Sequence, residues 1–547
     1  MGGHLLPEQR KRLGAYYTHQ EIVRYLAGWG ARRGPSSVMD PSCGDGRFLA
    51  EAARRGAGRL VGCDLDPHAV EVTRSRLALA GVRVELHGGD FFDLDPDATE
   101  PVDLVLGNPP FVRYQRFTGE TRRKALASAL RLGVKLTRLT SSWAPFLLHA
   151  VRFLSPGGDL AMVVPAEITN TQYGLVTLRA LQARFGGITL LAFERNLFEG
   201  AQEETYLLLA ADKGGRCRDI RLIPVGSLEE LREAGPSLSL LPGVQVPVLE
   251  GRCTRLAEAF LAPEERAAYR QVRELERVLR IGDLGELSNG YVTGANRFFH
   301  RTLPEAEAAG YPAAWLRPTV RSSRSLLGLY FTDRDIVFHE ERGTAHHLVL
   351  PVGGMFEPDP GALERFVREG EQLGVAGRYK CRTRKPWWRV PGVAGADVLL
   401  GYMIGTAPKA AVNRAGATYT NSLHGLRIDR GVPPEAVVLG LHTSVSLLSV
   451  EVEGRTYGGG VLKMEPTEMA RVLVPCPGLG EDAIRRAAER VDRLLREGRF
   501  QQAVEAADRA VLSEGLGLPE ETIARLRSGR RRLIRRRTGR ASGTNGP

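Results

Sequence analysis

The chain has 547 residues, of which 43% are hydrophobic and 25% charged, and this composition excludes a disordered or fibrous protein. Its formal net charge of +12 favours a polyanionic partner, although eight arginines of that excess lie in the segment Arg527–Arg540. The longest uncharged stretch, Ala436–Val450, is too short and too polar to span a membrane, and the six cysteines form no Cys-x-x-Cys pair. We therefore expect a protein without disulfide bonds or membrane spans that stays in the cytoplasm.

Short apolar runs alternate with amphipathic segments up to about residue 215, which predicts a doubly wound, Rossmann-like parallel sheet. The first helix is expected at Gln20–Trp29, with Thr18 as its N-cap. Two later apolar runs, Ile188–Phe193 and Thr205–Ala210, are separated by too few residues for a crossover helix, so they should pair antiparallel at the end of the sheet. The expected parallel strands are Ser37–Asp40, Leu60–Asp64, Arg83–Leu86, Val102–Leu106 and Leu160–Val164.

The composition of the remaining chain changes at two positions. From Pro242 it is rich in Gly and Pro with short apolar runs, which predicts a separate mixed α+β domain. After residue 475, apolar residues at helical spacing predict a helix that stops at Gly498 and a second helix at Arg499–Leu512, followed by the arginine-rich tail. That tail is either a solvated, disordered end or a nonspecific phosphate-binding segment. We therefore divide the chain into domains at 1–241, 242–475 and 476–547.

The first predicted strand ends at an acid, Asp40, and is followed by a turn that contains Gly44 and Gly46. Glycines let the backbone approach a nucleotide-like ligand at the carboxyl edge of a doubly wound sheet. A Gly-x-Gly pair by itself is equally typical of a tight turn between a strand and a helix. The turn therefore needs support from the strand ends that follow.

The second and third strands supply that support. Asp64 ends the second strand, where a carboxylate can accept both hydroxyls of a ribose, and Asp90 with Phe91 follows the third, where they suit an adenine amino group and ring. No third glycine completes a Gly-x-Gly-x-x-Gly pattern, which favours an adenosine without a pyrophosphate over NAD. Three strand ends should thus converge on one adenosine-shaped ligand.

The fourth strand ends in Asn108-Pro109-Pro110-Phe111, the most specific element of the chain. Two prolines fix the backbone, remove two donors and leave carbonyl oxygens pointing outward. The Asn108 side-chain oxygen and the Pro109 carbonyl can accept the two hydrogens of a planar amine, and Phe111 offers a ring for stacking. A proline-rich strand terminator alone would not explain an Asn and a Phe on either side of the prolines.

Together these segments resemble the amino-terminal half of the γ-type adenine-N6 DNA methyltransferases of bacterial restriction-modification systems. His19 stands where that family often has Pro, and the family's later aromatic wall for the target base is unclear here, where Tyr206 is the one aromatic residue of the last strand. The matching segments are Gly14–Thr18, Asp40–Phe48, Asp64, Asp90–Phe91 and Asn108–Phe111, with further similarity in Val292–Asn296, Pro386–Trp388 and Tyr457–Gly460.

The resemblance implies S-adenosylmethionine as cofactor and the N6 amino group of adenine in double-stranded DNA as acceptor. Asn108 and Pro109 would then draw the amine nitrogen towards tetrahedral geometry as it attacks the methyl group, and Phe111 would stack on the base after it is flipped out of the duplex. The catalytic residues implied are Asn108, Pro109, Pro110 and Phe111. The cofactor-binding residues implied are Tyr17, Thr18, Asp40, Gly44, Gly46, Asp64, Asp90, Phe91 and Asn108.

The second domain is the natural site for target recognition on DNA. Basic and aromatic residues alternate there, and a solvated basic loop beside a buried tryptophan pair explains the same pattern. Candidate DNA contacts are Arg113 and Tyr114 after the catalytic turn, and Lys380, Arg382, Arg384, Trp387 and Trp388 in the second domain. The His346–His347 pair lacks neighbouring ligands at metal-binding spacing, so we expect surface histidines and no metal.

Other acceptors and classes stay open. The same tetrapeptide chemistry serves protein glutamine, guanine in ribosomal RNA and cytosine N4. The large second domain favours site-specific DNA methylation over the first two, whereas cytosine N4 remains an alternative. A non-catalytic DNA-binding specificity subunit would have no use for four matched polar strand ends. No nuclease cluster is visible, so we expect a separate cognate restriction endonuclease, and a monomeric enzyme.

Overall fold

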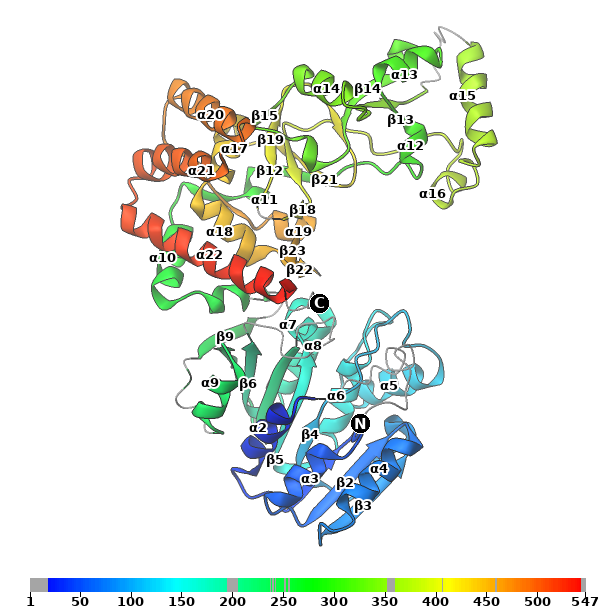
Figure 1. Cartoon of the computed structure of the whole chain (residues 1–547), viewed down its shortest axis with the longest axis vertical. Coiled ribbons are helices and arrows are strands. Elements are labelled where there is room, and N and C mark those ends of the chain that lie inside the picture. Colours follow the sequence, from blue (N-terminus) through cyan, green and yellow to red (C-terminus); the bar gives the residue numbers. More distant parts are fainter. Residues whose placement is uncertain are drawn as a thin grey trace. The chain divides into compact units, whose positions relative to one another are not determined.

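The computed structural model describes residues 18–193, 205–236, 238, 241, 243–249, 252–253, 256–351, 360–405, 407–457 and 460–542. The chain forms two compact units (Figure 1). The first unit comprises Met1–Phe260 with Thr538–Pro547, and the second comprises Leu261–Arg537. In the described part of the chain, no single helix is long and apolar enough to cross a membrane, whereas the bent helix pair Pro434–Leu441 and Ser444–Glu453 passes by length and composition.

A sheet in the order β10-β9-β8-β6-β7-β5-β4-β1-β2-β3 forms the centre of the first unit. Its strands are β1 Ser37–Asp40, β2 Arg59–Asp64, β3 Arg83–Gly88, β4 Val102–Gly107, β5 Leu154–Pro165, β6 Phe185–Phe193, β7 Thr205–Lys213, β8 Asp219–Val225, β9 Val244–Leu249 and β10 Arg252–Cys253. Strands β5, β4, β1, β2 and β3 are parallel neighbours, whereas β7 runs antiparallel between β5 and β6. The predicted Rossmann-like sheet with an antiparallel late strand is confirmed.

Helices pack on this sheet because its central strands are buried on both faces; every residue of β1, for example, is buried. Residues of α2, α3 and α9 share a core cluster with alternate strand residues, and residues of α5, α6 and α8 form another cluster. The helices are α2 Gln20–Ala31, α3 Arg47–Arg54, α4 Pro67–Leu77, α5 Gly119–Arg131, α6 Trp143–Val151, α7 Glu167–Asn170, α8 Gln172–Gln182 and α9 Leu228–Ala234, with 3₁₀ turns η1 Phe91–Asp93 and η2 Leu256–Phe260.

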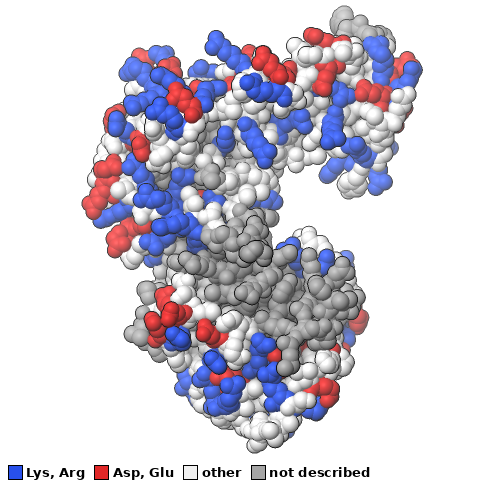
Figure 2. All heavy atoms as spheres, viewed as in Figure 1, with Lys and Arg blue, Asp and Glu red and all other residues white. Residues whose placement is uncertain are grey.

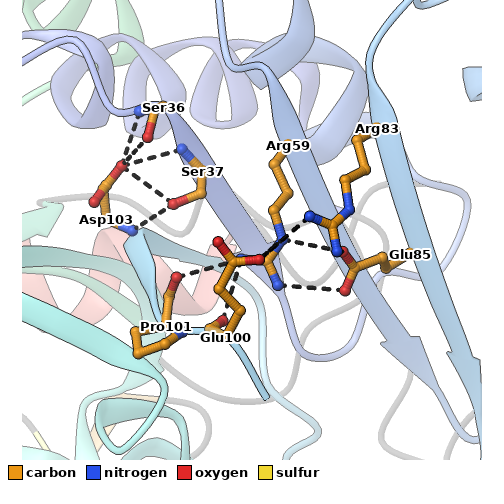
Figure 3. A network of polar contacts seen from close by, with 8 residues as sticks. All are labelled: Ser36, Ser37, Arg59, Arg83, Glu85, Glu100, Pro101 and Asp103. Atoms are coloured by element: carbon orange, nitrogen blue, oxygen red, sulfur yellow. Dashed lines mark hydrogen bonds and ion pairs between the residues drawn. The ribbon is translucent and has the colours of Figure 1, made fainter.

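Polar contacts fix the amino ends of the parallel strands (Figure 3). One carboxylate oxygen of Asp103, in β4, accepts hydrogen bonds from the backbone and hydroxyl groups of Ser36 and Ser37, before and at the start of β1. Arg59, at the start of β2, donates to Glu85 in β3 and to two backbone carbonyls before β4. These contacts hold the relative positions of four strands, whose opposite ends carry the predicted site.

The described residues of the second unit form four small sheets, in the orders β11-β24, β12-β21-β17-β19-β15, β13-β16-β14-β20 and β18-β23-β22. Its strands are β11 Val278–Arg280, β12 Gly285–Asn289, β13 His300–Arg301, β14 Leu316–Val320, β15 Tyr330–Phe331, β16 His347–Val349, β17 Val398–Gly401, β18 Met403–Ile404, β19 Ala410–Asn413, β20 Thr418–Tyr419, β21 Leu423–Ile428, β22 Arg455–Tyr457, β23 Val461–Lys463 and β24 Leu473–Pro475. This is the mixed α+β structure that the sequence predicts.

The helices of the second unit surround these sheets. They are α10 Pro263–Arg273, α11 Ile281–Leu284, α12 Asn296–Phe299, α13 Leu303–Ala308, α14 Asp333–Glu340, α15 Pro360–Gln372, α16 Tyr379–Arg382, α17 Pro434–Leu441, α18 Ser444–Glu453, α19 Pro466–Met469, α20 Glu481–Arg496, α21 Phe500–Ala507 and α22 Glu520–Ser542, with 3₁₀ turns η3 Ala313–Trp315 and η4 Ser323–Ser325 and the π-helix η6 Asp508–Gly515. The first predicted carboxy-terminal helix is α20, followed by Gly498 at φ +73°. The second predicted helix is divided into α21 and η6.

The expectation of a disordered arginine-rich end is wrong. The segment Arg527–Arg540 lies within α22, which runs along α18 in Figure 1. Buried Ile523, Leu526 and Leu533 give this helix an apolar face despite its charge. The arginines of that face pair within the second unit: Arg527 with Asp508, Arg532 with Glu265 and Arg537 with Glu451.

The two compact units and the predicted domains have different boundaries. Strands β9 and β10, beyond residue 241, still belong to the sheet of the first unit, and α20 and α21 belong to the second unit. The division into three functional domains stays a prediction.

The expectation of surface histidines is wrong for His346, which is fully buried and bonds through its ring to the Thr319 carbonyl and the Ser325 hydroxyl.

Candidate active site at the carboxyl edge of the first sheet

The strand order brings the predicted motifs together. Because β4, β1, β2 and β3 are parallel neighbours in this order, their carboxyl ends lie side by side along one edge of the sheet. This edge carries Asp40 at the end of β1, Asp64 at the end of β2, Asp90 after β3 and Asn108–Phe111 after β4. Tyr17, and the Gly14–Tyr16 part of the leading motif, lie outside the described residues.

The glycine turn adopts backbone conformations that favour glycine. Gly44 and Gly46 have φ values of +53° and +74°, and α3 begins at the next residue, Arg47. A Cβ atom at Gly46 would lie 2.9 Å from Thr73, whereas one at Gly44 would meet no described atom within 4 Å. Among the described residues, the turn is therefore packed at Gly46 and open at Gly44.

Asp40 is a buried acid at the centre of this edge. It is 0% exposed, and its Oδ1 accepts a hydrogen bond from the Ser42 backbone. Among the described residues, its Oδ2 has no hydrogen-bond partner. Burial, opposed by the Ser42 bond and assisted by the charges of Asp64 and Asp45, raises the pKa of Asp40 to about 8. A Cβ atom at Gly107 would lie 2.5 Å from Asp40 Oδ1, so glycine is needed there for β4 to pass this carboxyl group.

Asp64 links the second strand to the glycine turn. Its Oδ2 accepts a hydrogen bond of 2.8 Å from the Gly44 backbone, and its Oδ1 accepts one of 2.9 Å from the Asp66 backbone. Burial raises the pKa of Asp64 above its ordinary value. Each carboxylate oxygen has a second lone pair, so these bonds leave acceptor capacity for a ligand hydroxyl.

Asp90 and Phe91, which follow the third strand, lie in different surroundings. Asp90 caps η1 through the Phe92 backbone and accepts a hydrogen bond of 2.8 Å from the Thr121 hydroxyl of α5. The ring of Phe91 is buried against Phe146, with ring centroids 4.7 Å apart. The acid is therefore at the sheet edge, whereas the Phe91 ring lies within an aromatic cluster of the core.

The Asn108 side chain is held by a residue far away in sequence. Its Nδ2 donates to the hydroxyl of Thr18 over 3.2 Å, and its backbone carbonyl accepts from the Ser42 hydroxyl over 3.0 Å. The expectation that Thr18 is the helix N-cap is wrong: His19 caps α2 through the Glu21 backbone, which leaves the buried Thr18 hydroxyl for the amide of Asn108. Because the amide nitrogen is held, its oxygen has a defined direction.

The turn after Asn108 is held by Ser142. The Ser142 hydroxyl donates to the Pro110 carbonyl and accepts from the Val112 backbone. Pro109 is buried, Pro110 and Phe111 are half-buried, and Arg113 and Tyr114 are exposed. Neither Ser42 nor Ser142 was identified from the sequence, because single serines among many carry no signal without their contacts.

In the second unit, the predicted DNA-binding residues divide into exposed and packed groups. Lys380 and Arg382 are exposed on α16, where Lys and Arg side chains gather in Figure 2. Arg384 instead donates to the carbonyls of Val292 and Thr293. Trp387 stacks on the buried Phe366 of the aromatic core.

Trp388 is also half-buried and packs against Trp387 and the same aromatic core. The tryptophan pair thus supports the fold beside α16, as in the alternative interpretation of this segment. The exposed basic residues of α16 remain the candidates for contact with a phosphate backbone.

Comparisons with known proteins agree with this geometry. Residues 3–211 match the N-6 DNA Methylase family, and residues 254–512 match the C-terminal domain of Type II methyltransferase M.Eco57I. The chain is 26% identical over 485 residues to Type II methyltransferase M.XamI of Xanthomonas campestris pv. amaranthicola, which covers 86% of each chain. It is 22% identical to M.AccI of Acinetobacter calcoaceticus, which covers 86% of this chain and 87% of that one.

A solved structure shares the fold over most of the chain. The type IIL restriction-modification enzyme MmeI in complex with DNA matches with a TM-score of 0.53 and 12% identity, covering 97% of this chain and 80% of that one. The two family matches lie one in each half of the chain. Residues 3–211 therefore belong to the N-6 DNA methylase family, and the chain is an S-adenosylmethionine-dependent DNA methyltransferase that modifies adenine N6, of the kind found in restriction-modification systems.

Proposed function

We propose that the turn Asn108–Phe111 receives the target adenine and that the acids at the neighbouring strand ends hold the cofactor. The observation that carries this proposal is the fixed Asn108 amide. Its nitrogen donates to Thr18. The amide oxygen would then accept a hydrogen from the substrate amine, at the strand end adjacent to the glycine turn.

The residues present fit S-adenosylmethionine. Asp40 presents a fully buried carboxyl oxygen without a hydrogen-bond partner among the described residues, and the cofactor is a cation through its ammonium and sulfonium groups. Open space beside Gly44 allows close approach to the backbone. Asp64 would bind the ribose hydroxyls and Asp90 the adenine amino group. The roles of Tyr17, Thr18 and Gly46 towards the cofactor stay part of this proposal.

Asn108 and Pro109 would activate the acceptor. S-adenosylmethionine supplies an electrophilic methyl group. The Asn108 side-chain oxygen and the Pro109 carbonyl accept the two N6 hydrogens, which localises the nitrogen lone pair and stabilises the positive charge that develops on N6. The new bond joins N6 to the methyl carbon as the bond from that carbon to sulfur breaks, and N6 then loses one proton to solvent. No base is needed before the attack.

Phe111 would stack on the adenine after it leaves the duplex. Extrusion of a paired base costs a few kcal/mol, and stacking on an aromatic ring offsets part of it. Phe111 is half-buried, so one part of the ring is packed and another is accessible. Arg113 and Tyr114, exposed beyond the turn, would contact the DNA next to the extruded base.

The second unit would recognise the target sequence and the DNA backbone. Exposed Lys380 and Arg382 on α16 support this role, as does the fold shared with MmeI, whose solved structure contains DNA. We further propose a monomer that acts in the cytoplasm beside a separate restriction endonuclease specific for the same site.

Sequencing of DNA from cells that express the protein, by a method that detects modified bases, tests this function. We expect N6-methyladenine at one short sequence, and none in cells that express Asn108→Ala. N4-methylcytosine, or unmodified DNA despite a folded enzyme, would overturn the proposal.

A further inference from the structure

Ser142 lies immediately before helix α6 and contacts the catalytic turn through three hydrogen bonds. Its hydroxyl donates to the Pro110 carbonyl over 2.5 Å and accepts from the Val112 backbone over 2.8 Å. Its own backbone N–H donates to the Val112 carbonyl over 2.9 Å. Ser142 is 3% exposed, so these bonds are shielded from water.

These bonds bracket Phe111. The Pro110 carbonyl and the Val112 N–H are the backbone groups directly before and after this residue, and one hydroxyl joins them. The turn needs an external partner, because Pro109 and Pro110 have no N–H with which to form backbone hydrogen bonds of their own. Ser142 therefore restricts the backbone angles that orient the Phe111 ring.

The residues on both sides of Ser142 are anchored to Glu167, at the start of α7 just after strand β5. The indole of Trp143, which is fully buried, donates to Glu167 over 3.2 Å. The hydroxyl of Tyr173 donates to the same carboxylate and accepts from the Ser141 hydroxyl over 3.1 Å. Both neighbours of Ser142 are thus tied to α7, which makes Ser142 a fixed support for the turn.

We propose that Ser142 is a positioning residue that sets the Phe111 backbone so that the ring is ready to stack on the extruded adenine. This inference rests on the role proposed above for Phe111. It assigns no chemical step to Ser142, whose three hydrogen bonds to the turn all go to its backbone. Its effect should appear in base extrusion and turnover, and cofactor affinity should stay unchanged.

The test compares Ser142→Ala, Ser142→Cys and Ser142→Thr with Ser155→Ala. Ser155 is a matched control, because its hydroxyl also donates to the backbone of β4, at the Val102 carbonyl, at the opposite end of that strand. Each variant is measured on duplex DNA that carries the site found by sequencing, with adenine or the fluorescent analogue 2-aminopurine at the target position. Cofactor affinity is measured by calorimetry.

We expect Ser142→Ala and Ser142→Cys to lower kcat roughly 10- to 100-fold, because a turn that is no longer held misplaces the reacting groups. The fluorescence rise of extruded 2-aminopurine should weaken in both variants. Ser142→Thr keeps a hydroxyl and should retain most of the turnover and the signal, as should Ser155→Ala. Cysteine keeps the volume of the side chain with only a weak donor, so it separates loss of the bonds from loss of packing.

A folded Ser142→Ala or Ser142→Cys protein with the kcat and fluorescence of the wild type would overturn the inference. So would equal losses in Ser142→Thr and Ser142→Ala. Phe111→Ala separates this outcome from a failure of the proposed function. If Phe111→Ala also retains the fluorescence rise and turnover, the stacking role itself is wrong; if it loses both while Ser142→Ala does not, only the positioning role is wrong.

Discussion

The hydrogen bond from Asn108 to Thr18 helps to orient the amide that we propose as catalytic. Thr18 is 3% exposed, and its hydroxyl accepts from the amide nitrogen. Without this acceptor the amide can rotate by half a turn and present its nitrogen, a donor, to the substrate amine. A neutral hydrogen bond contributes about 1 kcal/mol, so its loss changes the balance of the two orientations by about fivefold.

Thr18→Val should therefore lower the single-turnover methylation rate by up to about fivefold, whereas Thr18→Ser should stay close to the wild type. Valine has nearly the same shape, so the core is preserved. Calorimetry of cofactor binding accompanies the rates, since a fall in affinity of the same size would assign Thr18 to the cofactor instead. Equal rates in Thr18→Val and the wild type would contradict the orienting role.

The ionisation of Asp40 makes the free energy of unfolding depend on pH. Its pKa is about 8 in the folded protein, mainly because of burial, and near 3.8 when unfolded. Between these two pKa values, the Asp40 carboxyl group is protonated in the folded protein and ionised in the unfolded protein. The contribution of Asp40 to the free energy of unfolding is therefore fully present below about pH 4 and is lost as the pH rises through 8.

Asp40→Asn should therefore gain stability relative to the wild type as the pH rises from 5 to 8.5. A shift of this size corresponds to several kcal/mol over the whole range. Urea unfolding of both proteins at three pH values, without cofactor, measures the difference. Parallel stability curves for the two proteins would show that Asp40 does not carry this dependence.

At the scale of elements, the strands and their motifs were predictable and the contacts between distant elements were not. Strand β1 matches its predicted bounds because its residues are buried on both faces and a polar turn follows at once. The contacts of Asn108 with Thr18 and of Val112 with Ser142 join residues 90 and 30 positions apart in the sequence. No local sequence pattern predicts such contacts. Parallel strand order alone brings the acids together.

Helix α22 illustrates how composition misled the sequence interpretation. Its arginines suggest a solvated end, but the spacing of Ile523, Leu526 and Leu533 places apolar residues on one helical face. Arg537 lies on that face too, and it forms a buried ion pair with Glu451 of α18. The charge of this segment thus serves partly to attach the helix within the second unit.

Arg537→Ala should destabilise the protein by about 3 to 5 kcal/mol, because it leaves the Glu451 carboxylate buried without its partner. Arg535→Ala, an exposed position on the same helix, is the control and should change stability by less than about 0.5 kcal/mol. Urea unfolding followed by circular dichroism compares them. Equal midpoints for the two variants would refute the attachment.

At the scale of the whole molecule, each unit has its own part in the proposed reaction. The first unit carries the strand-end acids and the catalytic turn, and the second carries exposed basic residues on α16. The change in composition along the sequence separates these regions. It does not show which of the candidate DNA-binding residues are exposed, because Arg384 and Trp387 differ from their neighbours only in their packing.

The double variant Lys380→Ala, Arg382→Ala should weaken binding to all DNA sequences alike and reduce the salt dependence of binding by about two phosphate contacts. Arg531→Ala, Arg535→Ala removes two exposed charges from α22 and is the matched control, with an unchanged slope expected. Affinities measured at several salt concentrations decide between these surfaces. A lower slope only in the α22 variant would assign phosphate binding to that helix.

Single-turnover methylation by Asn108→Ala tests the central claim most directly, with cofactor and DNA affinity measured on the same protein. In the proposed mechanism Asn108 stabilises charge that develops on N6 in the transition state, so its removal should affect turnover far more than binding. We expect a loss of nearly all methylation while both affinities stay close to those of the wild type. Methylation at the wild-type rate by Asn108→Ala would contradict it.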